Sequence, residues 1–387
     1  MSFAATSFRE ITRVDRSAFS LPAGLRGGAF VSAPLLLGVV TGQQELVYVT
    51  LGALFLTNTE GPRSVSAPLR VLFVACFVEA LAFGLGTLAG TTGLVAIPLM
   101  MVGVFLPLMF GAYPRWALVA MFTAIFFAVG VGLPGGSVGA SGSRLVFSLV
   151  GSFWGFAGVA LHRFIARPRA TGVTVGSASA GSTNSGSGAP HLGGPWAQPE
   201  AFKHAVIVGV ASGVGISIGL ALGLPRDFWV VVTIILAVRP NINATVSFTS
   251  MIVLGTVVGA TMAAFVTLGI TNDYLLWTLL FLFSVGQFAT RGMNLGLTQV
   301  FNTPFLIILL NILYPGEWQL AEVRILDVVI GGAIAVLTVY LLGIKRKQQP
   351  AAPLTQGVPP ATPGTGRSVG RRLRRRSSRC FSQMKTA

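Results

Sequence analysis

Residues 227–270 read DFWVVVTIILAVRPNINATVSFTSMIVLGTVVGATMAAFVTLGI, and this stretch decides the fold. Its only charged side chains are Asp227 and Arg239, and its apolar residues follow one another without the alternation of a half-buried strand. Within a bilayer, backbone polar groups are satisfied only in helices or closed barrels, and barrel strands alternate apolar with polar residues. The stretch therefore predicts two transmembrane helices, a short one over 227–240 and a longer one over 246–270.

Similar apolar runs with few charged residues recur along the chain. Of its 387 residues only 10% are charged, against roughly 25% in soluble domains. The first set of predicted spans is 26–41, 45–58, 69–89, 93–110, 114–132 and 144–165. The second set is 202–223, 227–240, 246–270, 274–289, 293–313 and 323–344. The sequence thus predicts an all-α polytopic membrane protein of about twelve transmembrane helices.

Charge and composition predict the orientation and the domain boundaries. If both termini are cytoplasmic, all of the 27 Lys and Arg residues except Arg144, Arg226 and Arg324 fall on the cytoplasmic side, as the positive-inside rule expects. The predicted parts are an N-terminal segment (1–25), a first membrane repeat (26–166), a linker (167–200), a second membrane repeat (201–344) and a basic tail (345–387). The Gly/Ser-rich linker and the tail lack the apolar residues needed for a core, so we expect both to be disordered and cytoplasmic.

Two features recur in the two predicted membrane repeats. The last span of each contains an Arg followed seven residues later by a Gly, Arg144 with Gly151 and Arg324 with Gly331. The second span of each is short and bears an aromatic residue near its start, over 46–57 and 228–238. Because each set has six spans, the two repeats are expected to be parallel, related by an axis along the membrane normal.

Motifs for enzymatic chemistry are missing from the sequence. It contains no phosphate-binding GxxxxGK[ST] loop, no HExxH and no CxxC, so we expect no enzymatic activity, no cofactor and no metal site. The net charge of +16 lies largely in the tail and between the spans, which indicates membrane topology and not a nucleic-acid partner. The expected partners are the lipid bilayer and a small substrate, with homo-oligomerisation left open.

The short spans supply the first candidate site residues. Short apolar segments at corresponding positions of two repeats indicate a transporter's substrate site. The candidates in and beside the second short span are Trp229, Thr233, Arg239 and Asn241. For Trp229, a role as an interfacial aromatic anchor is an equally good interpretation.

Polar residues inside spans supply further candidates. The span 293–313 carries Asn294, Gln299 and Asn302, which either join helices through hydrogen bonds or line a cavity. Glu79 lies in the middle of the span 69–89, where a carboxyl group serves either as a proton-coupling site or as a protonated interhelical hydrogen-bond partner.

The last candidates are the charged residues that open the final spans. Arg324 and Asp327 are three residues apart on one helix, a spacing that favours a structural ion pair over a place in the transport pathway. Arg144 has Phe147 at the corresponding position and no acid, so it is expected to be the freer cation.

These motifs resemble the fusaric acid resistance protein family, also called the aromatic acid exporter-like family, most closely over residues 201–344. The residues that carry the resemblance are Leu224, Pro225, Trp229, Thr233, Pro240, Gly255, Thr256, Gly259, Arg324, Asp327 and Gly331. The resemblance implies a bacterial inner-membrane protein with two six-span halves, and efflux of small aromatic or organic anions. The alternatives are a passive organic-anion channel and a membrane scaffold that transports nothing.

Overall fold

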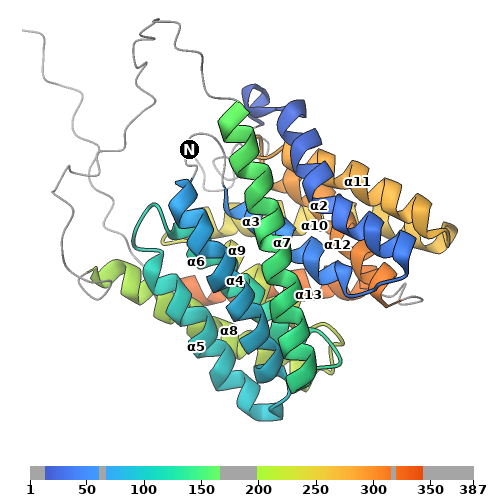
Figure 1. Cartoon of the computed structure of the whole chain (residues 1–387). Helices are drawn as coiled ribbons and strands as arrows, with labels where there is room; N and C mark the ends of the chain where they lie inside the picture. Colours follow the sequence, from blue (N-terminus) through green and yellow to red (C-terminus); the bar gives the residue numbers. More distant parts are fainter. Residues whose placement is uncertain (1–13, 61–66, 166–197, 315–319, 343–387) are drawn as a thin grey trace, which may run out of the picture. The chain divides into compact units, whose positions relative to one another are not determined.

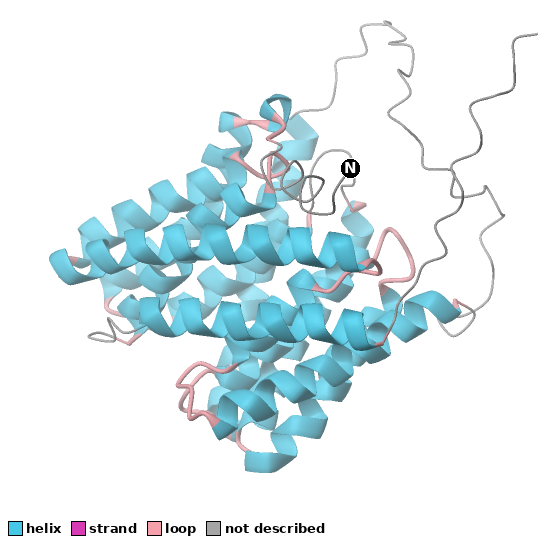
Figure 2. Ribbon diagram, turned by 180° about the vertical axis from the view of Figure 1, so that it is seen from behind, coloured by secondary structure: helices cyan, strands magenta, loops and turns pink. Residues whose placement is uncertain are grey.

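The computed structural model describes residues 14–60, 67–165, 198–314 and 320–342. Within these ranges every regular element is a helix, as the cyan ribbons of Figure 2 show. The chain divides into two units, Met1–Ile344 and Lys345–Ala387, and all the described residues belong to the first. The prediction of a disordered tail lies outside the described residues, as does that of the linker over 167–200 except at its end, where α8 begins at Pro199.

Twelve α-helices occupy the positions of the twelve predicted spans in the described ranges. The first six are α2 (Leu21–Thr41), α3 (Leu46–Thr59), α4 (Leu69–Gly90), α5 (Ala96–Phe110), α6 (Ala117–Gly132) and α7 (Val138–Ile165). The second six are α8 (Pro199–Ala221), α9 (Phe228–Ala237), α10 (Ile242–Gly269), α11 (Asp273–Ala289), α12 (Leu295–Leu313) and α13 (Leu320–Leu341). Short 3-10 helices, Arg16–Ala18 and Gly93–Val95, precede α2 and α5.

Three helices begin more than a turn before the predicted residue: α2 at Leu21 instead of 26, α7 at Val138 instead of 144, and α10 at Ile242 instead of 246. The helix predicted over 144–165 begins earlier, at Val138, because the Ser137 hydroxyl oxygen accepts a hydrogen bond from the Ala140 amide at 3.0 Å and caps it. Helix α9 ends at Ala237, before the predicted limit of 240, because Pro240 disfavours helical geometry at Arg239.

Length separates the helices into two groups. Eight are long and apolar enough to cross a membrane, whereas α3, α6, α9 and α11 are shorter. Helix α9 has only 10 residues and is therefore about 15 Å long, half the thickness of the hydrocarbon core. The chain is thus a multi-pass membrane protein in which four apolar helices are too short to qualify as spans by length and composition.

The helices pack in corresponding pairs. Helix α4 packs on α6 as α10 packs on α12, and α3 packs on α7 as α9 packs on α13. The two sets meet through α2 on α11, α5 on α8, and α6 on α9 (Figure 1). All six helices of each set therefore belong to one packed unit.

Glycine brings α7 and α13 close to the short helices. A Cβ atom on Gly151 would collide with the backbone oxygen of Val49 in α3. A Cβ atom on Gly331 would lie 2.6 Å from the backbone oxygen of Val230 in α9. Helix α7 can approach α3, and α13 can approach α9, at this short distance because these two residues carry no side chain.

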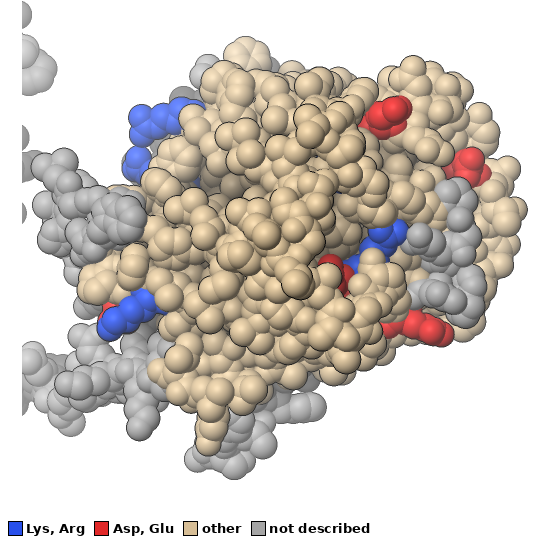
Figure 3. Space-filling model, turned by 90° about the horizontal axis from the view of Figure 1, so that it is seen from below, with Lys and Arg blue, Asp and Glu red and all other residues tan. Residues whose placement is uncertain are grey.

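The space-filling view shows a broad face on which uncharged side chains predominate (Figure 3). Lys and Arg gather mainly towards one end of this face and most Asp and Glu towards the other. Exposed apolar side chains on the helices, such as Leu81, Leu254 and Leu282, are about half exposed. A soluble protein rarely exposes so large an apolar surface, whereas lipid-facing helices require one.

Candidate functional site

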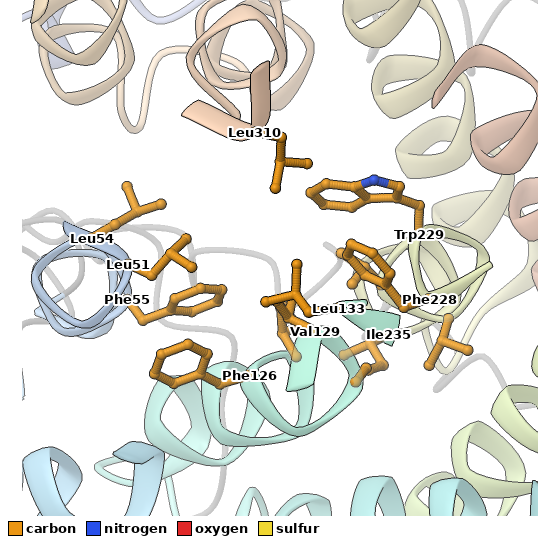
Figure 4. Packing of buried hydrophobic residues seen from close by; sticks show 14 of the residues in the cluster. Leu51, Leu54, Phe55, Phe126, Val129, Leu133, Phe228, Trp229, Ile235 and Leu310 are labelled. Atoms are coloured by element: carbon orange, nitrogen blue, oxygen red, sulfur yellow. The ribbon is translucent and has the colours of Figure 1, made fainter. Parts of the chain in front are cut away.

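A cavity of about 540 Å³ lies between α3, α6, α9 and α12. Figure 4 shows side chains from these four elements converging on one space; those that line the cavity are Leu51, Leu54, Phe55, Val129, Leu133, Phe228, Trp229 and Leu310. Small-molecule sites are typically concave, mostly apolar and of this size. The cavity is therefore the candidate site.

Five aromatic rings line the cavity among mostly aliphatic side chains. Phe55 lines it and is stacked on Phe126 at a centroid distance of 4.3 Å, and Phe126 is stacked on Phe83 at 4.4 Å. Phe122 and Phe248 line it from α6 and α10. Because stacked, buried rings are held in place by their neighbours, this wall offers a firm flat surface to a planar apolar group.

The two ends of the cavity differ in exposure. At one end Gly292 is exposed, and Asn58, Arg291 and Asn294 are half-buried. At the other end Phe228, Trp229 and Arg324 are all buried. Within the described residues, the cavity therefore opens at its Arg291 end and is closed at its Arg324 end.

Arg324 is a buried cation at the closed end. Its side chain is 2% exposed, and its guanidinium carbon lies 4.1 Å from the centroid of the Trp229 ring. Its Nε and Nη1 atoms are buried and have no hydrogen-bond partner among the described residues. Buried donors without hydrogen-bond partners are costly, so these two nitrogens are available to bind an anion.

The predicted ion pair between Arg324 and Asp327 is not formed among the described residues. Asp327 is completely buried, does not line the cavity, and both of its carboxyl oxygens lack hydrogen-bond partners. The two residues share a face of α13 as the sequence predicts, but the Arg324 guanidinium packs on the Trp229 ring instead. The two charges still interact electrostatically, but among the described residues they do not approach to ion-pair distance.

Arg291 is the cation at the open end. It lies between α11 and α12, and its Nη1 donates a hydrogen bond to the Thr57 carbonyl at 2.8 Å and its Nη2 one to the Asn58 carbonyl. These carbonyls belong to the last turn of α3, whose carbonyl groups have no partner within the helix. Burial lowers the pKa of Arg291 to about 10, which leaves it positively charged at neutral pH.

A second charge cluster lies beside Arg291. Glu60, which follows α3, pairs with Arg26 at 3.0 Å and with Arg163 at 3.6 Å. Arg163 also donates a hydrogen bond to the Ala67 carbonyl at 2.8 Å. The last turn of α3 is therefore held by side chains from three other parts of the chain.

The polar residues predicted on the span 293–313 face the cavity. Asn294, Thr298, Gln299 and Asn302 all line it. The Asn294 side chain caps α12 by accepting a hydrogen bond from the Gly296 amide at 2.7 Å. The Asn302 amide nitrogen donates a hydrogen bond to the Gln299 amide oxygen at 3.2 Å.

Besides Asp327 and Arg144, four of the predicted residues lie outside the cavity. The Glu79 carboxyl accepts a hydrogen bond from the Thr59 hydroxyl at 2.6 Å, and the Thr233 hydroxyl donates one to the Trp229 carbonyl at 2.9 Å. Asn241 caps α10, and Arg239 packs on the Phe248 ring at 4.3 Å. Of the residues predicted in and beside the second short span, only Trp229 lines the cavity.

Arg144 differs from the freer cation that the sequence indicates. Its guanidinium donates hydrogen bonds to the Leu133 and Pro134 carbonyls and to the Thr87 hydroxyl, and it lies over the Tyr48 ring at 5.4 Å. It does not line the cavity. The end of α6 and the loop after it supply these carbonyls, so protein acceptors already bind both terminal nitrogens of this cation, and only its Nε is without a partner among the described residues.

Sequence reasoning missed two polar residues and one helix of the site. Gln287 lines the cavity, and a lone amide in the apolar span 274–289 could have indicated it. Arg291 also lines the cavity, and the sequence places this residue between two spans without indicating a role in a site. Helix α6 contributes Met121, Phe122 and Ile125, which no sequence signal distinguishes from lipid-facing apolar residues.

Residues 213–338 match the fusaric acid resistance protein-like family, which confirms the resemblance over most of the second half of the chain. No curated protein and no solved structure matched the chain. The matched segment contains α9, α10, α11 and α12 with Trp229, Gln299 and Arg324. The family match therefore covers one side of the cavity, and the apolar helices together with it indicate a membrane transporter.

Proposed function

We propose, from the premise that residues 213–338 form a fusaric acid resistance protein-like region, that the chain exports small aromatic or organic anions through the cavity between α3, α6, α9 and α12. The observation that carries this proposal is Arg324, a buried cation with unused donors at the end of an aromatic-walled cavity. A guanidinium suits a carboxylate through two parallel hydrogen bonds. The aromatic wall suits the ring of the same molecule.

The proposed direction is outward, with both termini in the cytoplasm of a bacterial cell. Arg144 and Arg163 lie at opposite ends of α7, and Arg163, Arg26 and Arg291 share the end at which the cavity opens. That end is the cytoplasmic one by the positive-inside rule. A membrane potential that is negative inside supplies about 2.3 kcal/mol per 100 mV to an anion that leaves the cell.

The proposed architecture is two repeats related by an axis along the membrane normal. The corresponding packing of α3 on α7 and of α9 on α13 supports it. So does the corresponding placement of Arg144 over Tyr48 and of Arg324 over Trp229. A transporter of this plan carries its substrate between its repeats, where the cavity lies.

The test is flux of benzoate, the simplest aromatic carboxylate, from proteoliposomes with an imposed potassium diffusion potential. We expect protein-dependent efflux of radiolabelled benzoate that increases when the interior is negative, because the potential drives the anion outwards. Benzyltrimethylammonium, which has the same ring and the opposite charge, should leave no faster than from empty liposomes. Equal protein-dependent flux of the anion and the cation would contradict an anion carrier.

A further inference from the structure

Arg291 connects the two sets of helices at the mouth of the cavity. It follows α11, in the second set, and its guanidinium is bound to the Thr57 and Asn58 carbonyls of α3, in the first set. The side chain also lines the cavity, as does Asn58. One residue is therefore both a link between the sets and a charged part of the cavity surface.

The hydrogen bonds of Arg291 leave part of its guanidinium unused. A guanidinium has five N–H donors, and the bonds to the two carbonyls use two of them. The carbonyls at the end of α3 fix the plane of the group and attract its positive charge. Arg291 thus presents donors in a fixed orientation, which lowers the entropic cost of binding a ligand.

The charge near Arg291 favours an anion over a cation. Arg26, Arg163 and Arg291 provide three guanidinium groups in this cluster, whereas Glu60 provides the carboxylate. Arg26 and Arg163 are paired with Glu60 and do not line the cavity. Arg291 is consequently the cation of this cluster that an entering molecule meets.

We propose that Arg291 selects the substrate at the mouth of the cavity by binding its carboxylate before the molecule passes towards Arg324. This inference rests on the proposed function and identifies the residue that determines its anion specificity. The amide of Asn58 lies on the same stretch of cavity surface and offers a further hydrogen-bond partner. The aromatic ring of the substrate then faces the wall that contains Phe122 and Phe55.

Arg291→Gln tests the proposal through the affinity for benzoate, measured by isothermal titration calorimetry on the purified full chain in detergent. We expect the dissociation constant to rise by about tenfold or more, as for the loss of one hydrogen bond to a charged group. Arg291→Lys should give a smaller rise, because a lysine keeps the charge but cannot bind a carboxylate bidentately. The affinity for benzamide, which has the same shape and no charge, should not change in either variant.

Arg163→Gln is the matched control. Arg163 also donates a 2.8 Å hydrogen bond to a backbone carbonyl and belongs to the same cluster, but it does not line the cavity. The Arg163→Gln substitution removes the same charge at the same end of the cavity. Its effect therefore measures only the long-range electrostatic contribution to benzoate binding. We expect a change in benzoate affinity of less than about twofold, since a charge outside the cavity acts on the ligand only over a longer distance, at which salt screens it.

The outcomes separate this inference from the proposed function. An unchanged benzoate affinity in Arg291→Gln, an equal loss for benzoate and benzamide, or an equal loss in Arg163→Gln would overturn the role of Arg291. So would a wild-type chain that binds no benzoate. A wild-type chain that binds benzoate through Arg291 but does not move it across the bilayer would support the inference and contradict the proposed function. If Arg291→Gln does not fold, the comparison of benzoate with benzamide in Arg291→Lys decides.

Discussion

Arg324→Gln should reduce benzoate flux at least 100-fold while leaving the protein folded. Two hydrogen bonds from a guanidinium to a carboxylate contribute about 1.5–3 kcal/mol each, and together they correspond to about 100-fold or more in affinity. The variant loses the contact with Trp229, worth about 0.5–2 kcal/mol, but it also removes a buried cation that has unused donors. Proteoliposome flux and thermal unfolding in detergent measure the two effects separately.

Arg144→Gln is the control for Arg324→Gln. Arg144 occupies the corresponding position on α7, is equally buried and also lies on an aromatic ring, but protein acceptors bind its guanidinium. We therefore expect the reverse pattern, a lower unfolding temperature and an unchanged KM for benzoate in the fraction that folds. A large rise in KM with normal stability would show that Arg144, and not Arg324, meets the anion.

Gly151→Leu should prevent folding. The new Cβ atom would overlap the backbone of Val49, and neither helix can yield locally because the obstacle is main chain and not a flexible side chain. Overpacking commonly destabilises a protein by about 1–3 kcal/mol even where side chains can move. We therefore expect a collision with the backbone to destabilise it by at least the upper value of this range. Leucine is a strong helix former, so a loss of folded protein would not result from low helix propensity. The yield of monodisperse protein on size-exclusion chromatography measures it.

Gly142→Leu is the matched control, because Gly142 lies on the same helix and a Cβ atom there meets no heavy atom within 4 Å. Replacing a glycine inside a helix stabilises it by about 0.5–1 kcal/mol when space is available. We expect the yield of this variant to equal or exceed that of the wild type. Normal folding of Gly151→Leu would mean that α3 and α7 do not pack as described.

The helices could be predicted from the sequence because their signal is local. Apolar runs bounded by charges, glycine and proline placed all twelve helices, and even the short α9 was indicated by the interval between Asp227 and Pro240. The start of α7 was missed because the Ser137 cap lies in a Gly-rich segment that reads as a loop. The sequence also indicated the polar residues of α12 that line the cavity.

The partners of the charged residues could not be predicted, since they depend on contacts between distant parts of the chain. Helical spacing correctly places Arg324 and Asp327 on one face of the helix. It does not indicate that the Arg324 guanidinium packs on the ring of Trp229, which lies about a hundred residues away in the sequence. Likewise, nothing local indicates that Arg291 reaches α3. A lipid-facing and a cavity-facing phenylalanine also look alike in sequence, so the role of α6 emerged only from packing.

The most direct test of a transport path through this cavity is to block it. The chain contains only two cysteines, Cys76 and Cys380, so a variant with both replaced by serine provides a background for Thr298→Cys, which lines the cavity, and Leu282→Cys, which is exposed on α11. After complete labelling with N-ethylmaleimide, confirmed by mass spectrometry, benzoate flux should be lost in the Thr298→Cys protein and retained in the Leu282→Cys protein. Undiminished flux through fully labelled Thr298→Cys protein would contradict the account.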